Sequence, residues 1–572
     1  DDIQVNFINA QGGTIGGTIG IATNRLFRAI GSFSTANCGN ASICTAGGTT
    51  GGSITIQHGG GITTPFIIGN LTQNGTVSNI TAGSETLANL TISVPPDVFT
   101  QGNIQIITST PPPTPIPQLP DLNSAATDIE GKKPASLGES TTDTGDQNIL
   151  NVFLPSTTRT QIESLLDQGK ISEAVVSIDT LYTEELAVYI EQMLERELES
   201  LAQMQERLQA IASETGKKPA IIYTFARPEQ LDLILVTPDG TPIYKSIQAA
   251  NREALSGTIK DLLSEITNRR KLRSTSYKES AQQLYQWIIA PLEADLQAQG
   301  IDTIAFSMDT GLRGIPLAAL YDGQEFLVEK YSIGLIPSLN LTDTRYQSLK
   351  GTRILAMGAS QFRDQQPLPA VPVELSTIVS KVWTGQSFLN EAFTLDNLKS
   401  QRANEPFGII HLATHGQFQA GQPSNSFIQL WNTKLRLNQL RQLGWSNPPV
   451  ELLVLSACRT ALGDEQAELG FAGLAVQAGV KSAVASLWSV SDEGTLGLMT
   501  EFYQQLSQTP IKAEALRQAQ LAMLKEEVRL QGGELHSRGE NIALPPDMMN
   551  LGDRSLAHPY YWGAFTIIGS PW

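Results

Sequence analysis

Cysteine, aromatic residues and long hydrophobic runs are all scarce in this chain of 572 residues. The chain has only three cysteines, and no histidine or acidic residue lies close to Cys38 and Cys44, so we expect no zinc site. No run approaches the roughly eighteen apolar residues of a transmembrane helix, so we expect no membrane-spanning segment. A Gly-Lys-Ser/Thr loop and a Gly-x-Gly-x-x-Gly motif after a strand are also missing, so we expect no nucleotide and no other cofactor.

Positive charge is in short supply as well. The chain has 39 Lys and Arg against 56 Asp and Glu, which gives a net charge of −17. Nucleic acids and anionic membranes need clustered Lys and Arg, so neither is an expected partner, whereas a cationic protein segment would be attracted. With 41% hydrophobic residues the chain can form roughly two to four domains, at least one of them with a large core.

The N-terminal part is nearly free of charge and rich in Gly, Thr, Asn and Ile. Residues 1–108 carry short strand-like pieces separated by Gly and Asn turns, which favour a β-solenoid, with a β-sandwich or a low-complexity linker as alternatives. Cys38 and Cys44 lie in a polar loop where a disulfide is geometrically feasible; the alternative is free thiols in a cytoplasmic protein. The chain opens at Asp1 without an initiator Met or signal peptide, so we expect a fragment or processed product.

The remaining sequence changes character several times. Residues 109–155 are rich in Pro, Ser, Thr and Asp and are predicted to form a linker, and residues 156–215 have helical periodicity. Residues 216–350 combine a predicted hairpin with a long helical region and further strands, the last of them over 327–336. Residues 351–572 alternate strand and helix as parallel sheets require. The expected fold class is therefore α/β, preceded by a helical segment and a small all-β module.

Two buried strands of the last region are each predicted to end at a residue with catalytic chemistry. One apolar run leads into His415 and Gly416, and another leads into Cys458. The carboxyl edge of a parallel sheet is where ligands bind, so neighbouring strands would bring thiol and imidazole within reach. His415 would act as the general base for Cys458, and the N–H groups of Gly416 and Cys458 would form an oxyanion hole. The alternative is a Cys458 that only packs in the core.

Six sequence blocks after Ile304 resemble the CHAT domains of bacteria, which are similar to caspases and separases. They are GLRGIPLAAL at 311–320, HLATHGQF at 411–418, LSACRTALG at 455–463, ASLWSVSD at 485–492, ALRQAQ at 515–520 and HPYYWGAF at 558–565. The resemblance implies a caspase-like α/β sandwich with a half that lacks a dyad, residues 216–350, and an active half, residues 351–572. His415 and Cys458 match the catalytic dyad of the family. Residues 1–108 look like the end of a filamentous-haemagglutinin-type secretion domain of cyanobacteria, which implies export.

Relatives of this kind differ in the side chain that they read before the scissile bond, which is Asp in caspases and Arg or Lys in separases and metacaspases. The resemblance makes Asp492 a specificity candidate because its block is similar to a segment near the separase pocket. Asp464 is a second candidate, and the weaker ones are Glu465 and Glu468. Ordinary solvated carboxylates are the alternative. Ser489 departs from the pattern, because separases tend to carry an acid there. The other histidines, which we expect to be structural, are His58, His411, His536 and His558.

These observations predict a cysteine endopeptidase that cleaves a protein or peptide, with a basic residue before the scissile bond. An activating partner protein is compatible with this prediction. The alternative is a non-catalytic surface adhesin or scaffold in which the CHAT-like region binds partners. Residues 531–555 are predicted to be a mobile loop, where Arg538 and Arg554 would be either self-cleavage sites or ordinary exposed residues.

Overall fold

The chain divides into two compact units, Asp1–Gly138 and Glu139–Trp572. The computed structural model describes residues 3–5, 8–10, 18–22, 27–29, 32–35, 38–46, 52–58, 66–68, 74–82, 85–88, 90–92, 98–101, 103–108, 158–190, 199–538 and 540–572. It describes only the main chain for Ala457, Cys458, Glu540 and several strand residues of the first unit. The predicted linker, 109–155, lies outside the described residues, as does part of the predicted helical segment, 191–198. The domain boundaries drawn from the sequence stay predictions.

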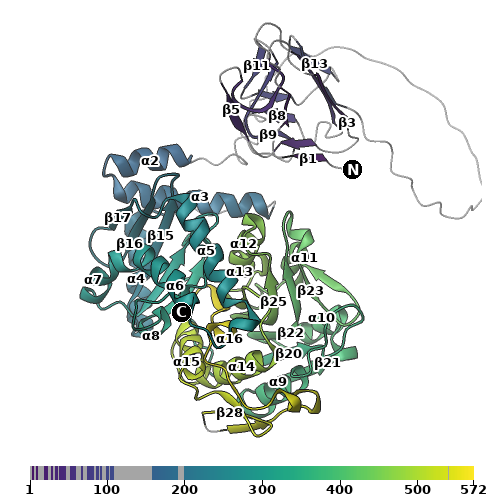
Figure 1. The fold of residues 1–572 in the computed structure, drawn as a ribbon. Helices are drawn as coiled ribbons and strands as arrows, with labels where there is room; N and C mark the ends of the chain where they lie inside the picture. Colours follow the sequence, from purple (N-terminus) through teal and green to yellow (C-terminus); the bar gives the residue numbers. More distant parts are fainter. Residues whose placement is uncertain are drawn as a thin grey trace, which may run out of the picture. The chain divides into compact units, whose positions relative to one another are not determined.

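The first unit consists of short strands in three sheets, and most of the strand pairs are parallel (Figure 1). One sheet joins β1 (Ile3–Val5), β4 (Phe27–Ala29), β9 (Gly75–Thr76), β8 (Phe66–Ile68) and β12 (Leu90–Ile92); a second joins β2 (Ile8–Asn9), β6 (Gly39–Cys44), β10 (Asn79–Ala82), β11 (Glu85–Leu87) and β5 (Phe33–Thr35); a third joins β3 (Thr18–Ala22), β7 (Ser53–His58), β14 (Ile104–Thr108) and β13 (Val98–Gln101). The strands β5, β11, β12 and β13 each pair antiparallel with one neighbour.

Apolar side chains from all three sheets share one core, including Phe27, Ile43, Ile56 and Ile106. Parallel pairing around a common core is the arrangement of a β-solenoid, whereas a β-sandwich stacks antiparallel sheets. The solenoid prediction is therefore confirmed. The predicted disulfide is present as well: Cys38 and Cys44 are bonded, with their Cα atoms 6.1 Å apart.

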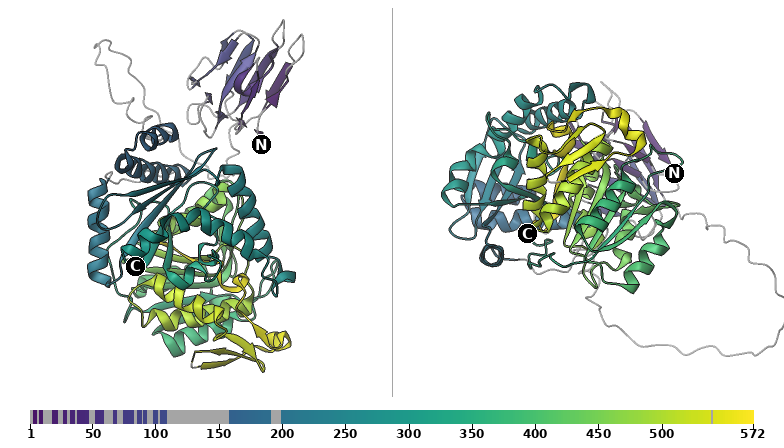
Figure 2. Two further views of the ribbon diagram at one scale, coloured as in Figure 1. Left: turned by 60° about the vertical axis from the view of Figure 1, so that its left-hand side comes forward. Right: turned by 90° about the horizontal axis from the view of Figure 1, so that it is seen from below.

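The second unit is organised around a thirteen-stranded sheet with helices on both faces (Figures 1 and 2). The strand order is β17 (Ile243–Ile247), β16 (Leu231–Val236), β15 (Pro219–Ala226), β18 (Thr303–Ser307), β19 (Ser332–Ile336), β31 (Phe565–Gly569), β26 (Ser482–Ser486), β25 (Leu452–Thr460), β22 (Ile409–Phe418), β20 (Ile354–Gly358) and β21 (Gly385–Leu389), and β22 also carries the short pair β23 (Phe427–Gln429) and β24 (Lys434–Arg436). The α/β sandwich predicted from the sequence is confirmed.

Helices connect most of these strands. They are α2 (Arg159–Asp167), α3 (Ile171–Tyr189), α4 (Leu201–Thr215), α5 (Arg252–Ile266), α6 (Tyr277–Ile288), α7 (Ala290–Ala298), α8 (Leu327–Lys330), α9 (Val371–Thr377), α10 (Leu395–Asn404), α11 (Leu437–Leu440), α12 (Glu465–Ala472), α13 (Leu474–Ala478), α14 (Asp492–Leu506), α15 (Lys512–Leu524) and α16 (Pro559–Trp562). Thr158 and Ser200 begin α2 and α4 with capping boxes, which satisfy main-chain N–H groups that a helix start leaves unpaired.

The last strand of the chain joins the two halves of the sheet. Strand β31 pairs in parallel with β19 of the first half and antiparallel with β26 of the second, so that Ile567 lies between Gly334 and Val484. The halves that the sequence distinguishes thus form one continuous sheet. The two halves are therefore joined only by a strand from the C-terminal end of the chain.

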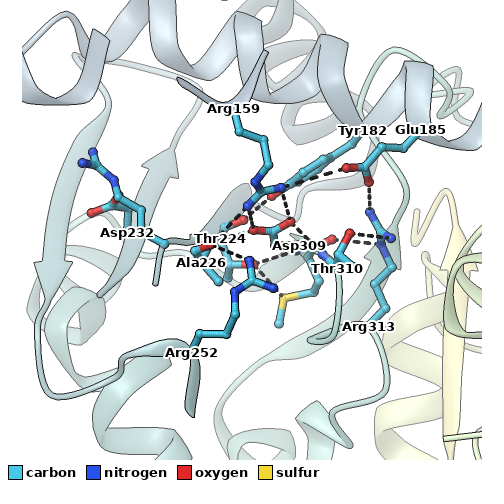
Figure 3. A network of polar contacts seen from close by, with 12 residues as sticks. Arg159, Tyr182, Glu185, Thr224, Ala226, Asp232, Arg252, Asp309, Thr310 and Arg313 are labelled. Carbon is cyan, nitrogen blue, oxygen red and sulfur yellow. Dashed lines mark hydrogen bonds and ion pairs between the residues drawn. The ribbon is translucent and has the colours of Figure 1, made fainter. Parts of the chain in front are cut away.

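A buried carboxylate ties the helical segment to this sheet (Figure 3). Asp309, two residues after the end of β18, is fully buried. It accepts hydrogen bonds from Arg159 at the start of α2, one of them 2.9 Å long, and from the Ala226 N–H at 2.7 Å. Arg252 donates to the Ala226 carbonyl oxygen at 2.9 Å, and the Arg159 guanidinium lies 4.4 Å from the centre of the Phe225 ring. Helices α2 and α5 are therefore fixed against the carboxyl ends of β15 and β18.

Two predictions about secondary structure are wrong. Residues 531–555 do not form a loop, because 529–555 contain a small antiparallel sheet of β27 (Arg529–Gln531), β28 (Glu534–Ser537), β29 (Glu540–Ala543) and β30 (Arg554–Ser555). Strands this short show no alternation in the sequence. Arg554 pairs with Glu493 at 2.7 Å, and Arg538 pairs with Glu527. The first residues of the predicted strand 327–336 form helix α8 instead.

Candidate active site

Two neighbouring parallel strands carry the residues that the sequence singled out. Apart from His411, strands β22 and β25 consist of buried apolar residues up to Leu412 and Leu455, and each has neighbouring strands on both sides in the sheet. Their register places His415 beside Ala457 and Gly416 beside Cys458, after an irregularity between Leu412 and His415. The main chains of the three predicted residues, His415, Gly416 and Cys458, are therefore brought together.

The sequence predicts that the two strands end at His415 and Cys458, and this prediction is wrong. Strand β22 continues to Phe418 and β25 to Thr460. The extension arises because β22 pairs beyond the irregularity with β23, where Gly416 lies opposite Ile428 and Gln417 opposite Phe427. His415 and Cys458 thus lie near the carboxyl ends of their strands, within the sheet.

The His415 imidazole is held by a loop that the sequence analysis missed. Its Nε2 lies 2.8 Å from the carbonyl oxygen of Gln366, and its ring packs on Phe362 with 4.6 Å between the ring centres. A ring nitrogen that faces a carbonyl oxygen must carry the hydrogen, so in the neutral ring Nδ1 keeps its lone pair. Burial lowers the pKa of His415 below its usual value, and the bond to Gln366 opposes this effect. The imidazole is therefore neutral and basic at Nδ1 near pH 7.

No side-chain motif could have revealed this loop. Gln366 acts through its main-chain oxygen, which any residue supplies, and Phe362 is one aromatic residue in a polar stretch. The one hint is the place of the loop, which follows the end of β20 at Gly358 and therefore starts at the carboxyl edge of the sheet, before α9 begins at Val371.

Asp492 lies at the start of α14 and contacts the same loop. Its Oδ2 accepts a hydrogen bond from the Ala370 N–H at 2.6 Å. Burial raises the pKa of Asp492 to about 7, and the neighbouring carboxylates Glu374 and Glu493 contribute to this rise. The hydrogen bond from Ala370 acts in the opposite direction. The loop that fixes His415 through Gln366 is thus also held by Asp492 through Ala370.

The acidic residues after Cys458 have structural partners. Asp464 caps α12 and accepts the Ala467 N–H at 2.9 Å, whereas Glu465 is exposed. Glu468 is buried, which raises its pKa, and it accepts the Gly463 N–H at 2.8 Å. A Cβ atom at Gly314 would lie only 2.5 Å from Glu468 Oε1, so this glycine permits close packing of the two segments. Glu468 therefore fixes the loop after Cys458 from inside.

The other histidines lie in structural settings. His411 is fully buried, with its Nε2 2.9 Å from Glu374 Oε1 and its Nδ1 3.0 Å from the Tyr503 hydroxyl. His558 accepts the Tyr560 N–H at the start of α16, and His536 lies on β28 with its Nε2 3.2 Å from a carbonyl oxygen. His58 belongs to the first unit, where its Nδ1 lies 2.9 Å from Asn74.

A groove of about 450 Å³ opens next to His415. Phe362 lines this groove and also packs against the His415 ring. Its lining comes from the loop 362–365, from β22 and from the short strands β23 and β24. Among the described residues, no three His, Cys, Asp or Glu side chains are grouped so as to hold a metal ion. A search of the same residues for helices long and apolar enough to span a membrane finds none.

One comparison with known proteins identifies a family for the second unit of the chain. A family model described as "CHAT domain" matches residues 278–570, just over half of the chain. No curated protein sequence matches the chain.

Among solved structures, the Saccharomyces cerevisiae separase in its complex with securin is similar over 70% of this chain and 34% of its own, with 12% identity and a TM-score of 0.39. The chain thus spans about a third of the length of that separase. The Porphyromonas gingivalis RgpB pro- and mature domains are similar over 56% of this chain and 76% of their own, with 12% identity and a TM-score of 0.31. The Arg-specific cysteine proteinase gingipain R is similar over 56% and 75%, with 14% identity and a TM-score of 0.30.

Proposed function

Since the chain belongs to the CHAT domain family, we propose that it is a cysteine endopeptidase that uses Cys458 as nucleophile and His415 as general base. One observation carries this proposal: the register of β22 and β25 puts His415 and Gly416 beside Ala457 and Cys458. A nucleophile and a base on adjacent strands of a rigid sheet are held in place before a substrate binds, which is the arrangement that covalent catalysis needs.

The proposed reaction has two stages. His415 Nδ1 takes the proton of the Cys458 thiol, and the sulfur attacks the carbonyl carbon of the scissile peptide bond. The C–N bond breaks, the imidazolium gives its proton to the leaving amine, and a thioester remains on Cys458. Water then attacks the thioester with His415 as base, which releases the acid product and restores the thiol. The N–H groups of Gly416 and Cys458 are the proposed donors to the oxyanion.

The Gln366 carbonyl oxygen has a positioning role in this proposal. Its bond to Nε2–H selects the tautomer with a free lone pair at Nδ1 and stabilises the imidazolium that forms when the proton is taken up. The lowered pKa of His415 keeps the ring neutral near pH 7, so it is ready to act as a base.

For the residue before the scissile bond we propose a basic side chain, with Asp492 as its partner and Asp464 as the weaker candidate. Asp492 contacts the loop that holds His415, which supports its placement near the substrate. The helix-capping bond of Asp464 speaks against a direct role for that residue.

We also propose that the protein acts on a polypeptide outside the cytoplasm, and that a protein partner activates it. The Cys38–Cys44 disulfide supports an oxidising compartment, because cytosolic proteins keep such thiols reduced. The relation of residues 1–108 to haemagglutinin-type secretion domains remains part of this proposal.

The test is covalent labelling by peptidyl acyloxymethyl ketones that carry Arg or Asp before the reactive group, read by intact mass. Cys458→Ala and His415→Ala are the matched controls. Labelling of the unchanged protein alone, faster with Arg than with Asp, is the expected result. The contrary result is that neither probe reacts, either with or without calcium, although iodoacetamide modifies Cys458. The chain would then be a non-catalytic scaffold or adhesin, or an enzyme that is inactive without its partner.

A further inference from the structure

The groove beside His415 has a floor made of one face of three strands. Gln417 follows His415 by two residues on β22 and therefore lies on the same face of the sheet. Gln417 lies opposite Phe427 on β23, and Phe427 lies opposite Arg436 on β24. The floor thus leads from the proposed base across β23 to the outer strand β24, which pairs with β23 alone.

Charge along this groove is opposite in sign to that of the chain. Three cations line it, namely Arg363 from the loop and Lys434 and Arg436 from β24, against one carboxylate, Asp364. All four are exposed, and none of the three cations forms an ion pair with a carboxylate of the described residues. Lys434 lies 4.0 Å from the centre of the Phe427 ring, and Arg436 donates to the Ser424 carbonyl oxygen. Arg363, Lys434 and Arg436 therefore give the groove a local positive charge in a chain whose net charge is −17.

The remaining lining suits a polypeptide. Amide side chains such as Gln417 and Gln429 offer both donors and acceptors, and the rings of Phe362 and Phe427 offer apolar contacts. Such a lining can bind the main chain of an extended peptide, whereas the cations select carboxylates on its side chains. A nucleic acid fits less well, because its many phosphates would also meet the strongly negative remainder of the chain.

We propose that this basic groove, defined by Arg363, Lys434 and Arg436, binds an acidic segment of the polypeptide substrate close to the scissile bond. The role of the groove in substrate binding rests on the proposed peptidase function. It adds a second requirement for the substrate, besides the residue before the scissile bond. The chain selects substrates with Asp or Glu residues beside the cleavage site, independently of the residue that Asp492 would read.

Binding can be tested without turnover in the Cys458→Ala chain. A fluorescent glutamate-rich peptide is compared with its glutamine and lysine counterparts by fluorescence anisotropy at several salt concentrations. We expect the glutamate peptide to bind most tightly, with an affinity that falls as salt rises. Lys434→Glu with Arg436→Glu should weaken its binding by about tenfold or more, because two attractive pairs become repulsive. Arg363→Glu alone should weaken it several-fold.

The matched control is Lys260→Glu with Arg270→Glu, which changes the net charge equally at exposed positions on α5 and just after it. Circular dichroism checks that each variant is folded. If the Lys434→Glu, Arg436→Glu variant does not fold, Arg363→Glu tests the proposal in its place. Equal weakening by the control, preference for the lysine peptide, or tighter binding of an RNA of the same charge would overturn the proposal.

A second arm separates this proposal from the peptidase function. On the unchanged chain, a P1 Arg probe flanked by Glu should label Cys458 faster than its Gln counterpart, and the β24 variant should abolish the difference. If no probe labels Cys458 but the acidic peptide still binds through β24, the peptidase function fails and the groove stands as a peptide site. If labelling occurs without any effect of acidic residues, the groove proposal alone fails.

Discussion

The chemistry of the site depends on the surroundings of two residues, His415 and Asp492. Each is partly buried against the loop between β20 and α9, and burial moves the pKa of each toward its neutral form. The pKa of His415 is therefore lower than that of an ordinary histidine, which favours the neutral ring. The pKa of Asp492 is higher than that of an ordinary aspartate, so its carboxyl group keeps the proton to a higher pH. Both effects come from desolvation, so both respond to changes in packing.

Removing the ring that covers His415 should raise its pKa. In Phe362→Ala, water reaches the imidazole, so its pKa moves up toward 6.5 and the acid limb of kcat/KM moves to higher pH by the same amount. Titration of the histidine NMR signals measures the shift. His58 in the other unit, whose pKa burial lowers to about 4, is the internal control. An unchanged His415 titration would contradict the role given to Phe362.

Asp492 should make the second unit less stable as pH rises. Its folded-state pKa of about 7 lies above the value of 3.8 for an unfolded chain, so its contribution is fully present below pH 3.8 and is lost as pH rises to about 7. Asp492→Asn keeps an acceptor for Ala370 and removes this loss, so at pH 8 it should raise the free energy of unfolding by about 1–2 kcal/mol. Urea unfolding at pH 5 and pH 8 measures it, with the exposed Asp396→Asn as control. The same gain at both pH values would argue against a titrating Asp492.

At the scale of secondary-structure elements, His411 links β22 to the helices that pack around the site. This residue is buried on the same strand as His415 and bridges to α9 through Glu374 and to α14 through Tyr503. Helix α9 directly follows the loop that holds His415, and α14 begins with Asp492, which accepts a hydrogen bond from Ala370 of that loop. The position of the loop therefore depends on polar contacts within the core as well as on apolar packing.

Breaking the buried His411–Glu374 contact should be costly. Glu374→Ala leaves the buried His411 ring without its neighbouring carboxylate, so the free energy of unfolding should fall by about 1–3 kcal/mol. Urea unfolding followed by tryptophan fluorescence measures the loss. Glu391→Ala, which changes an exposed carboxylate, should have almost no effect. A loss no larger than that of the control would show that the contact contributes little.

The sequence identified elements whose signal is local and missed those that depend on the partner strand. Buried runs such as 452–455 and 482–486 predict strands of a parallel sheet, and their order along the chain predicts the sandwich. The continuation of β22 past His415 could not be foreseen, because it requires the pairing with β23. Gln366 was missed because its main-chain oxygen carries no sequence signal, and the roles of Asp464 and Glu468 depend on where helix α12 begins.

At the scale of the whole molecule, the two units have separate cores and different dependence on oxidation. The solenoid core contains only residues of the first unit, and the disulfide closes a loop within it. The large core of the second unit is made of residues from 162 onward. All seven tryptophans lie between 287 and 572, so their fluorescence reports only on the second unit.

Loss of the disulfide should therefore affect one unit only. Replacing Cys38 and Cys44 by serine should destabilise the first unit by about 2 kcal/mol, because the unfolded chain gains entropy. The melting transition seen by tryptophan fluorescence should stay unchanged, whereas the β-sheet signal in circular dichroism should melt in part at lower temperature. A shift of the tryptophan transition would show that the units unfold together.

The account depends most on the pairing of Cys458 with His415, which can be measured without a substrate. The rate of alkylation of Cys458 by iodoacetamide, followed by mass as a function of pH, gives the pKa of its thiol. The disulfide protects the other two cysteines. We predict that Cys458 is alkylated faster near pH 7 in the unchanged chain than in His415→Ala, because the neutral imidazole takes the proton of the thiol as the sulfur attacks. The same rate and the same thiol pKa in both proteins would contradict the dyad and would leave the CHAT region as a scaffold.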